Sequence, residues 1–171
     1  MNLKSRFLIG VSLALAYCGS AFAQDKSLKI GVLTDLSGFY TDVSGAGSVL
    51  AAQMAVEDSG LEKKGWKIDV LSGDHQNKAD IGVGIARQWF DRDKVDVVAD
   101  LVTSSVALAV NNLAKEKNKV MLASGAGTSD LTNGQCWPNT VQWTYDTYML
   151  AHGTGTAVTK GGGKRWFFLT A

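Results

Sequence analysis

Three hydroxyl residues in a row stand where an apolar run gives way to a helical pattern. They are Thr103, Ser104 and Ser105, and the apolar run before them covers residues 95–101. Backbone N–H groups at a helix start lack partners, and together with neighbouring hydroxyls they can donate hydrogen bonds to an anion. A carboxylate ligand suits this chemistry. The alternative is helix capping, in which one hydroxyl satisfies the helix end without any ligand.

A second segment repeats this pattern after the next apolar run. Ser124, Gly125, Ala126 and Thr128 follow the run at residues 119–123. Glycine lets a ligand approach the backbone closely, although the same glycine can serve only to make a turn. The repetition favours ligand binding over capping alone, and we expect both segments to contact the ligand.

Aromatic residues in other parts of the chain supply candidate pocket walls. Phe39 and Tyr40 follow the first apolar run and could face the apolar or aromatic body of a ligand, with loop packing as the alternative. Trp143 and Tyr145 raise the same question, and for them we expect packing in the core.

The sequence shows no pattern typical of catalysis, metal binding or cofactor binding. His75 and His152 lie far apart and have no Cys or His at the spacing of metal ligands. Gly45 and Gly47 begin like a dinucleotide fingerprint, but Leu50 stands where the third glycine belongs. No G-x-S-x-G nucleophile motif is present. We therefore expect no enzyme, no metal and no cofactor.

The elements that must position these loops alternate between strand and helix patterns. Apolar runs typical of buried strands cover residues 28–34, 67–71, 95–101 and 119–123, and residues 140–143 could form a short crossing strand. Helical spacing covers residues 45–58, residues 77–90 with Asn77 as cap, residues 104–114 with Ser104 or Ser105 as cap, and residues 146–158 with Asp146 as cap. This order predicts a parallel, doubly wound α/β sheet, whose ligands bind beyond the carboxyl ends of the strands.

The amino-terminal residues predict export. Lys4 and Arg6 precede a short apolar run, and small residues then lead to the A-x-A pattern that ends at Ala23. This order is typical of a secretory signal peptide, residues 1–23, and the run is too short to span a bilayer. Cys18 offers a lipoprotein alternative, but Tyr17 stands where a lipobox needs a small residue. We expect a periplasmic protein without direct membrane insertion.

The charge of the remaining chain argues against nucleic acid as a partner. Residues 1–23 hold two of the 17 basic and none of the 16 acidic residues, so the remainder has a net charge of −1. Nucleic-acid binding usually needs a basic surface. Cys136 then has no partner cysteine, so we expect either a free buried thiol or a partner missing from an incomplete chain.

The last apolar run, residues 165–170, predicts a strand that needs sheet neighbours and covering helices. Almost no sequence follows to provide them. We therefore expect a truncated chain, with a first lobe at residues 24–142 and a hinge crossing and the start of a second lobe at residues 143–171.

Several motifs, in their order along the chain, resemble the periplasmic substrate-binding proteins of branched-chain amino-acid-type ABC transporters. They lie at residues 29–38, 51–58, 100–110, 124–132 and 143–148. The resemblance implies a type I periplasmic binding fold, in which two α/β lobes joined by three crossovers close on a ligand. It also implies that the loops matching residues 103–105 and 124–128 hold the ligand's carboxylate, while Phe39 and Tyr40 face its side chain.

The function implied by this resemblance is capture of a small carboxylate, an amino acid or an aromatic acid, for the membrane permease of an ABC importer. Because a second lobe would supply the other wall of the cleft, we expect the 171-residue chain alone to bind poorly or not at all. A secreted α/β hydrolase and the ligand-sensing domain of a receptor remain the alternative functions.

Overall fold

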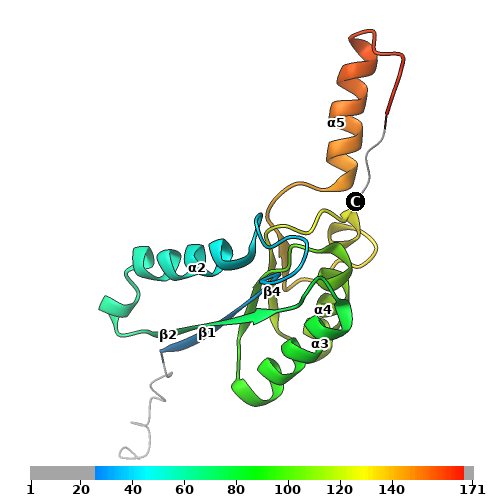
Figure 1. The fold of residues 1–171 in the computed structure, drawn as a ribbon. Coiled ribbons are helices and arrows are strands. Elements are labelled where there is room, and N and C mark those ends of the chain that lie inside the picture. Colours follow the sequence, from blue (N-terminus) through cyan, green and yellow to red (C-terminus); the bar gives the residue numbers. More distant parts are fainter. Residues whose placement is uncertain (1–25, 168–171) are drawn as a thin grey trace, which may run out of the picture.

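Five parallel strands form one sheet in the computed structural model, which describes residues 26–167 (Figure 1). The strands are β1 (Ser27–Thr34), β2 (Lys67–Asp74), β3 (Val97–Asp100), β4 (Val120–Ala123) and β5 (Thr140–Gln142), in the order β2-β1-β3-β4-β5. Every neighbouring pair is parallel. All five strands lie where the apolar runs predicted them, and the predicted parallel α/β architecture is confirmed.

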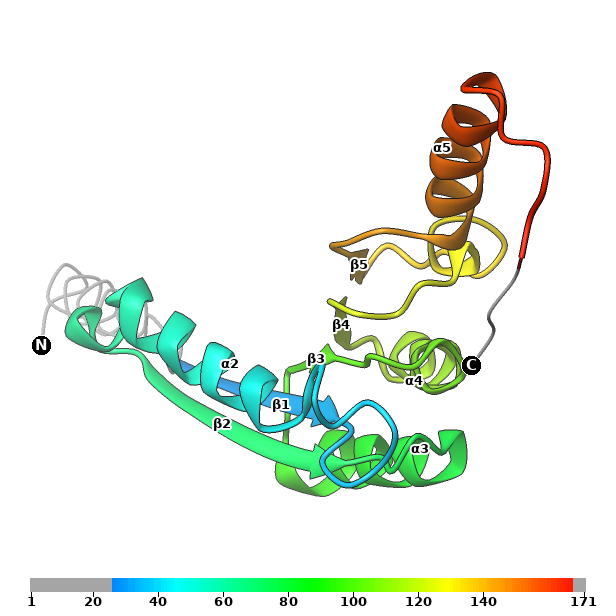
Figure 2. The ribbon, with the colours of Figure 1, turned by 45° about the horizontal axis from the view of Figure 1, so that its top comes forward.

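Helices cover the two faces of this sheet. They are α2 (Gly45–Ser59), α3 (Ala79–Gln88), α4 (Ser104–Lys117) and α5 (Thr147–Lys160), with the short helical turns η2 (Glu62–Lys64), η3 (Trp89–Asp93) and η4 (Ser129–Thr132). Figure 2 shows α3 and α4 on one face and α2 on the other, while α5 projects away from the sheet. Most of the core lies between the sheet and α3 and α4, where Leu33, Val98, Val110 and Met121 are fully buried.

The face that α2 shares is only partly covered. α2 contacts β1 and β2, whereas apolar side chains farther along the sheet reach solvent. Leu122 on β4 is 40% exposed, Val141 on β5 is 42% exposed, and Trp143 just after β5 is 81% exposed. The expected core packing of Trp143 is therefore wrong. In the described residues, this face of β4 and β5 has no helix over it (Figure 2).

The helix starts agree only in part with the predicted caps. Asp146 caps α5 as predicted, because its carboxylate accepts a hydrogen bond from the N–H of Met149 at 2.6 Å. However, Lys78 rather than Asn77 stands at the N-cap of α3, and Thr103 rather than Ser104 or Ser105 stands at that of α4. Both helices begin without a capping side chain, so the nearby polar side chains are free to make other bonds.

Three further predictions concern the two ends of the chain and Cys136. The predicted signal peptide, residues 1–23, lies outside the described residues. Residues 165–167 form no strand. They follow α5 and lie away from the sheet, so they have no neighbouring strand there to pair with (Figure 1). The rest of that predicted strand, residues 168–170, is not described. Cys136 is free and exposed, so the expected buried thiol is wrong.

None of the helices within residues 26–167 has both the length and the apolar character needed to cross a bilayer.

Candidate ligand-binding site

The sheet order places a crevice at the carboxyl ends of β1 and β3. From β1 the chain moves outward to β2, and it then returns to the other side of β1 to build β3, β4 and β5. The loops after β1 and β3 therefore leave in opposite directions. In open parallel sheets, ligands bind at this point of reversal, which is where the candidate loops lie.

A pocket of about 650 Å³ lies among these loops. Its lining comes from the loop after β1 (Phe39, Tyr40, Asp42, Val43), the loop after β3 with the start of α4 (Val102, Ser104), the loop after β4 (Gly125, Gly127) and the segment after β5 (Tyr145). The three loops expected to meet at a ligand therefore do meet, and they enclose a volume suited to a small molecule.

Only some of the predicted site residues line this pocket. Phe39, Tyr40, Ser104 and Gly125 do so. The predicted residues that are not part of its lining are Thr103, Ser105, Ser124, Ala126 and Thr128.

Most of the predicted residues outside the lining hold the loops in place. Thr103 donates its hydroxyl to Oδ1 of Asn77 at 2.7 Å, and Ser124 donates its hydroxyl to Oδ1 of Asp100 at 2.8 Å. The hydroxyl of Thr128 accepts the N–H of Asp130 at 3.2 Å and so caps η4. Loop positioning therefore uses hydroxyls that the sequence also offered to a ligand.

The pocket also contains residues that the sequence did not single out as ligand contacts. They are Asp42, Val43, Val102, Gly127 and Tyr145. Tyr145 was expected in the core, but it is 44% exposed, and Gln142 positions it by donating from Nε2 to the carbonyl oxygens of Ala126 (2.7 Å) and Tyr145 (3.2 Å). Adjacency to a predicted contact could have identified Val102 and Gly127, whereas Asp42 and Val43 lie farther along the loop than Tyr40.

The start of α4 gives the pocket its capacity to bind an anion. Ser104 is the first residue of α4 and lines the pocket, and no side chain caps this helix. The N–H groups of a helix's first turn carry partial positive charge and point away from the helix. None of the described lining residues is Lys or Arg, and Asp42 adds a carboxylate. Hydroxyl and backbone donors are thus the groups available to a ligand carboxylate.

Buried and partly buried carboxylates shape the loop after β1. Asp35 is fully buried and accepts the N–H groups of Gly38 and Tyr40, each at 2.8 Å. A Cβ built on Gly38 would lie 2.5 Å from Oδ1 of Asp35, so only glycine fits there. These two hydrogen bonds fold the loop so that Phe39 and Tyr40 reach the pocket, where their rings pack edge to face at 5.1 Å.

Asp74, the last residue of β2, ties the same loop to the sheet. It accepts the N–H of Leu36 at 2.9 Å and the hydroxyl of Ser37 at 2.6 Å. Burial acts to raise the pKa of Asp74, but the hydrogen bonds from Ser37, Gln76 and Leu36 outweigh it and lower that pKa. The charged carboxylate is therefore the form that holds the loop.

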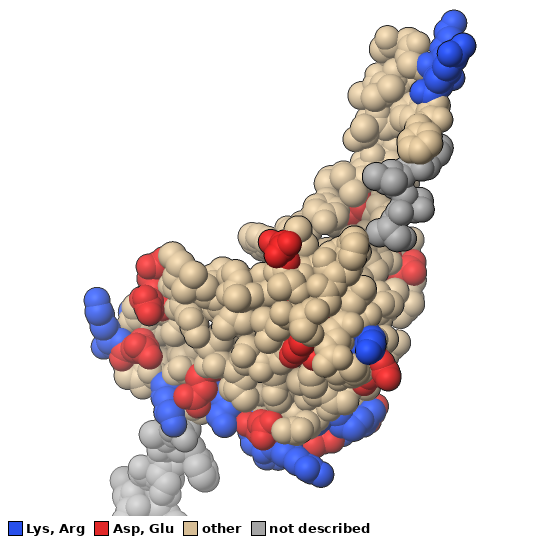
Figure 3. Space-filling view, in the orientation of Figure 1, with Lys and Arg blue, Asp and Glu red and all other residues tan. Residues whose placement is uncertain are grey.

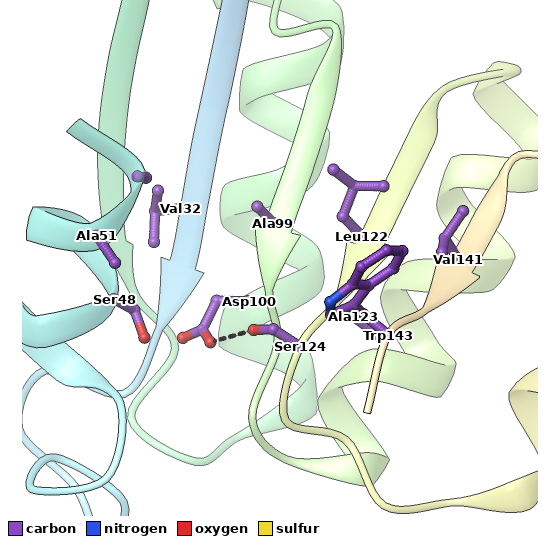
Figure 4. A pocket seen from close by; sticks show the side chains of 11 residues that line it. Val32, Ser48, Ala51, Ala99, Asp100, Leu122, Ala123, Ser124, Val141 and Trp143 are labelled. Carbon is purple, nitrogen blue, oxygen red and sulfur yellow. Dashed lines mark hydrogen bonds between the residues drawn. The ribbon is translucent and has the colours of Figure 1, made fainter. Parts of the chain in front are cut away.

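A second pocket, of about 280 Å³, lies on the partly covered sheet face (Figure 4). Apolar side chains dominate it, but Ser48, Asp100 and Ser124 form a polar group at one end. Within residues 26–167, no three His, Cys, Asp or Glu side chains lie close enough together to hold a metal ion.

Comparison with known proteins assigns the chain to a family. The model of the periplasmic binding protein family matches residues 27–171. No curated protein matches the chain. A periplasmic binding protein from Burkholderia mallei is 51% identical over 85% of this chain, with a TM-score of 0.79. A branched-chain amino acid ABC transporter periplasmic ligand-binding protein from Burkholderia xenovorans is 38% identical over 82% of the chain, with a TM-score of 0.75.

A third solved structure is a solute-binding protein of an ABC transporter from Rhodopseudomonas palustris in complex with benzoate. It is 25% identical over 80% of this chain, with a TM-score of 0.70. The matches cover 39%, 37% and 38% of these three proteins, respectively, so the chain spans well under half of their length. The family match over residues 27–171 and the two Burkholderia proteins, which are 51% and 38% identical to this chain, agree with the parallel α/β fold. The chain belongs to the periplasmic binding protein family.

Proposed function

We propose that this protein is the solute-binding component of an ABC importer in the periplasm and that its pocket binds a small carboxylate. In this proposal, residues 24–142 form most of one ligand-binding lobe, and residues 143–171 are the crossing into a second lobe and its start. The single observation that carries the proposal is the uncapped start of α4, where Ser104 faces the pocket. A carboxylate can accept hydrogen bonds there from a hydroxyl and from backbone N–H groups.

The rest of the lining supports a ligand with an apolar body. Phe39, Tyr40 and Tyr145 are aromatic, and Val43 and Val102 are aliphatic. The benzoate complex of the R. palustris protein and the name of the B. xenovorans protein supply two ligand classes, an aromatic acid and a branched-chain amino acid. Both classes join a carboxylate to an apolar group. A membrane permease is the partner that this function requires.

Titration of the purified chain with benzoate, 4-hydroxybenzoate and isoleucine tests the proposal, with amide chemical shifts as the measurement. We expect at least one of these carboxylates to shift the amides of Ser104, Gly125 and Gly127 with a dissociation constant in the millimolar range, about −4 kcal/mol. The affinity is weak because the described pocket offers one wall. The corresponding primary amides, which lack the carboxylate charge, should cause no saturable shift. Equal responses to acids and amides, or tight binding, would contradict this expectation.

Two adjacent serines provide a matched pair of variants. Ser104→Ala removes a hydroxyl that lines the pocket, whereas Ser105→Ala removes one that does not. A hydrogen bond to a charged group contributes about 1.5–3 kcal/mol, so Ser104→Ala should weaken carboxylate binding by about tenfold or more. Ser105→Ala should leave the affinity within about twofold, because it alters only the helix surface beside the pocket. If the two variants lose affinity equally, Ser104 does not contact the ligand.

A further inference from the structure

Asp100 is a buried carboxylate at the carboxyl end of β3, two residues before the pocket residue Val102. Its side chain is only 6% exposed. One oxygen, Oδ1, accepts the hydroxyl of Ser124 at 2.8 Å, while Oδ2 is buried and has no hydrogen-bond partner among the described residues. Burying a carboxylate is unfavourable unless hydrogen bonds compensate. Asp100 is therefore an unusual residue for this position, and its carboxylate has a single hydrogen bond, the one from Ser124.

The backbone at Asp100 is unusual as well. Asp100 has φ of 81° and Leu101 has φ of 59°, so two consecutive residues other than glycine adopt the left-handed region. Side chains disfavour this conformation, and it persists only where the surroundings enforce it. Leu101 donates its N–H to the carbonyl oxygen of Leu33 at 3.0 Å, and Ser124 donates its N–H to that of Asp100 at 3.0 Å. β1 and the loop after β4 thus hold the strained turn.

This turn joins two walls of the ligand pocket. The loop after β3 continues from it to Val102 and Ser104, and the loop after β4 continues from Ser124 to Gly125. The two loops touch, because a Cβ built on Gly125 would lie 3.0 Å from Cα of Val102. The Asp100–Ser124 hydrogen bond lies directly behind this contact in both loops. It can therefore set the spacing between donors on one loop and the backbone of the other.

We propose that Asp100 is a positioning residue, whose hydrogen bond with Ser124 holds the loops at residues 102–105 and 125–128 at the spacing that ligand binding needs. The relevance to binding rests on the proposed function, whereas the effect on the loops does not. Figure 4 shows the hydroxyl of Ser48, on α2, pointing toward the carboxylate from the side opposite Ser124. Ser48 lines the same small pocket, but it makes no hydrogen bond with Asp100 and so provides a matched control.

Hydrogen exchange of the ligand-free chain tests the positioning role. Asp100→Ala and Ser124→Ala should each speed amide exchange in residues 102–105 and 125–128 by about tenfold, because local opening no longer breaks that hydrogen bond. Exchange in β2 and α3, which lie away from this bond, should stay unchanged. Asp100→Asn should behave like the unmodified chain, because its amide oxygen still accepts the Ser124 hydroxyl. Ser48→Ala should also have no effect.

The outcomes separate the two levels of the proposal. Unchanged loop exchange in Ser124→Ala, or an equal increase along the whole chain, would overturn the positioning role; if Asp100→Ala does not fold, Ser124→Ala decides it. Titration with 4-hydroxybenzoate then measures the consequence for binding. Ser124→Ala should weaken binding by about threefold or more, whereas Asp100→Asn, which keeps the hydrogen bond, should bind as the unmodified chain does. If the unmodified chain binds none of the three carboxylate probes, the proposed function fails while the exchange experiment still decides the role of Asp100.

Discussion

At the scale of single residues, polar side chains at the ends of β1 to β4 divide into two groups. Ser104 faces the pocket. The hydroxyl of Thr103 instead donates a hydrogen bond to Asn77, and that of Ser124 donates one to Asp100. Both uses follow from the same chemistry, because a hydroxyl can bond to a ligand or to a neighbouring loop. Residue type alone therefore identifies the right region but not the group that binds.

His75 is a residue whose role is in stability rather than in the pocket. It is fully buried, and its Nδ1 accepts the N–H of Asn77 at 3.0 Å. Burial lowers the pKa of His75, while the carboxylates of Asp35, Asp100 and Asp74 raise it in part. Protonation of Nδ1 would also turn it into a donor facing another donor. The neutral imidazole is thus the form that the fold accommodates.

We therefore predict that acid destabilises the protein through His75. The unfolded chain binds this proton more tightly than the folded chain does, so the free energy of unfolding falls as the pH drops below the unfolded pKa of about 6.5. Urea unfolding at about pH 7.5 and about pH 5 should show a smaller difference in His75→Gln than in the unmodified protein. Asp74 titrates below this window, because its lowered pKa lies under 3.8.

His152→Gln is the control for this prediction. His152 is exposed on α5, where its ring stacks on Tyr148 at 4.2 Å. Its removal should leave the pH dependence unchanged, and equal effects from the two histidines would show that burial of His75 is not the cause.

At the scale of elements, the packing of Trp89 explains two glycines, one in β1 and one in the edge strand β2. A Cβ built on Gly31 in β1 would lie 2.5 Å from the Trp89 ring, and one on Gly73 in β2 would lie 2.9 Å from it. Trp89, at the end of α3, is only 5% exposed. Glycine in a strand marks a place where another group approaches closely, and here the group is the indole ring under the strand pair.

Gly31→Ala should therefore destabilise the fold by about 1–3 kcal/mol, because the added methyl overlaps a ring that cannot move without disturbing the core. Gly84→Ala is the matched change, since nothing lies within 4 Å of its position on the exposed side of α3. It should stabilise the protein by about 0.5–1 kcal/mol, because alanine favours a helix over glycine. Urea unfolding measures both, and a neutral Gly31→Ala would mean that Trp89 has room to shift.

At the scale of the whole molecule, many of the charged side chains in view lie along one edge (Figure 3). Figure 3 shows Lys and Arg mixed with Asp and Glu along the lower edge, while a broad area of the face in view is uncharged. Leu122, Val141 and Trp143 on the open sheet face are exposed apolar side chains.

Export is a prediction at this scale. In a Gram-negative host, the chain should reach the periplasm with Gln24 as its first residue, because the A-x-A pattern ends at Ala23. Mass spectrometry of the periplasmic fraction measures the new end. Ala23→Tyr should block cleavage by placing a bulky residue at the site, whereas Ala14→Leu, within the apolar run, should not. A cytoplasmic product of full mass from the unmodified sequence would contradict the prediction.

The sequence by itself determined the parts of the structure that depend on local pattern. Apolar periodicity located all five strands and the four main helices, because burial of one face imposes a spacing on nearby residues. Asp146 was identified as a cap, since a cap needs only the helix that follows it. The loops of the pocket followed from the same reasoning, because the carboxyl ends of parallel strands meet at one edge.

Only the tertiary structure decided which side chains in those loops face the ligand pocket. Ser104 and Ser105 are adjacent and alike, but each helical step turns the side chain by about 100° and only Ser104 lines the pocket. Tyr145 lines it because Gln142 holds that segment against the loop after β4. Ser124 reaches Asp100 because β3 and β4 pair in a register that sets Asp100 opposite Ala123, the residue before Ser124. These contacts depend on how the loops and strands pack together, so a local sequence pattern cannot predict them.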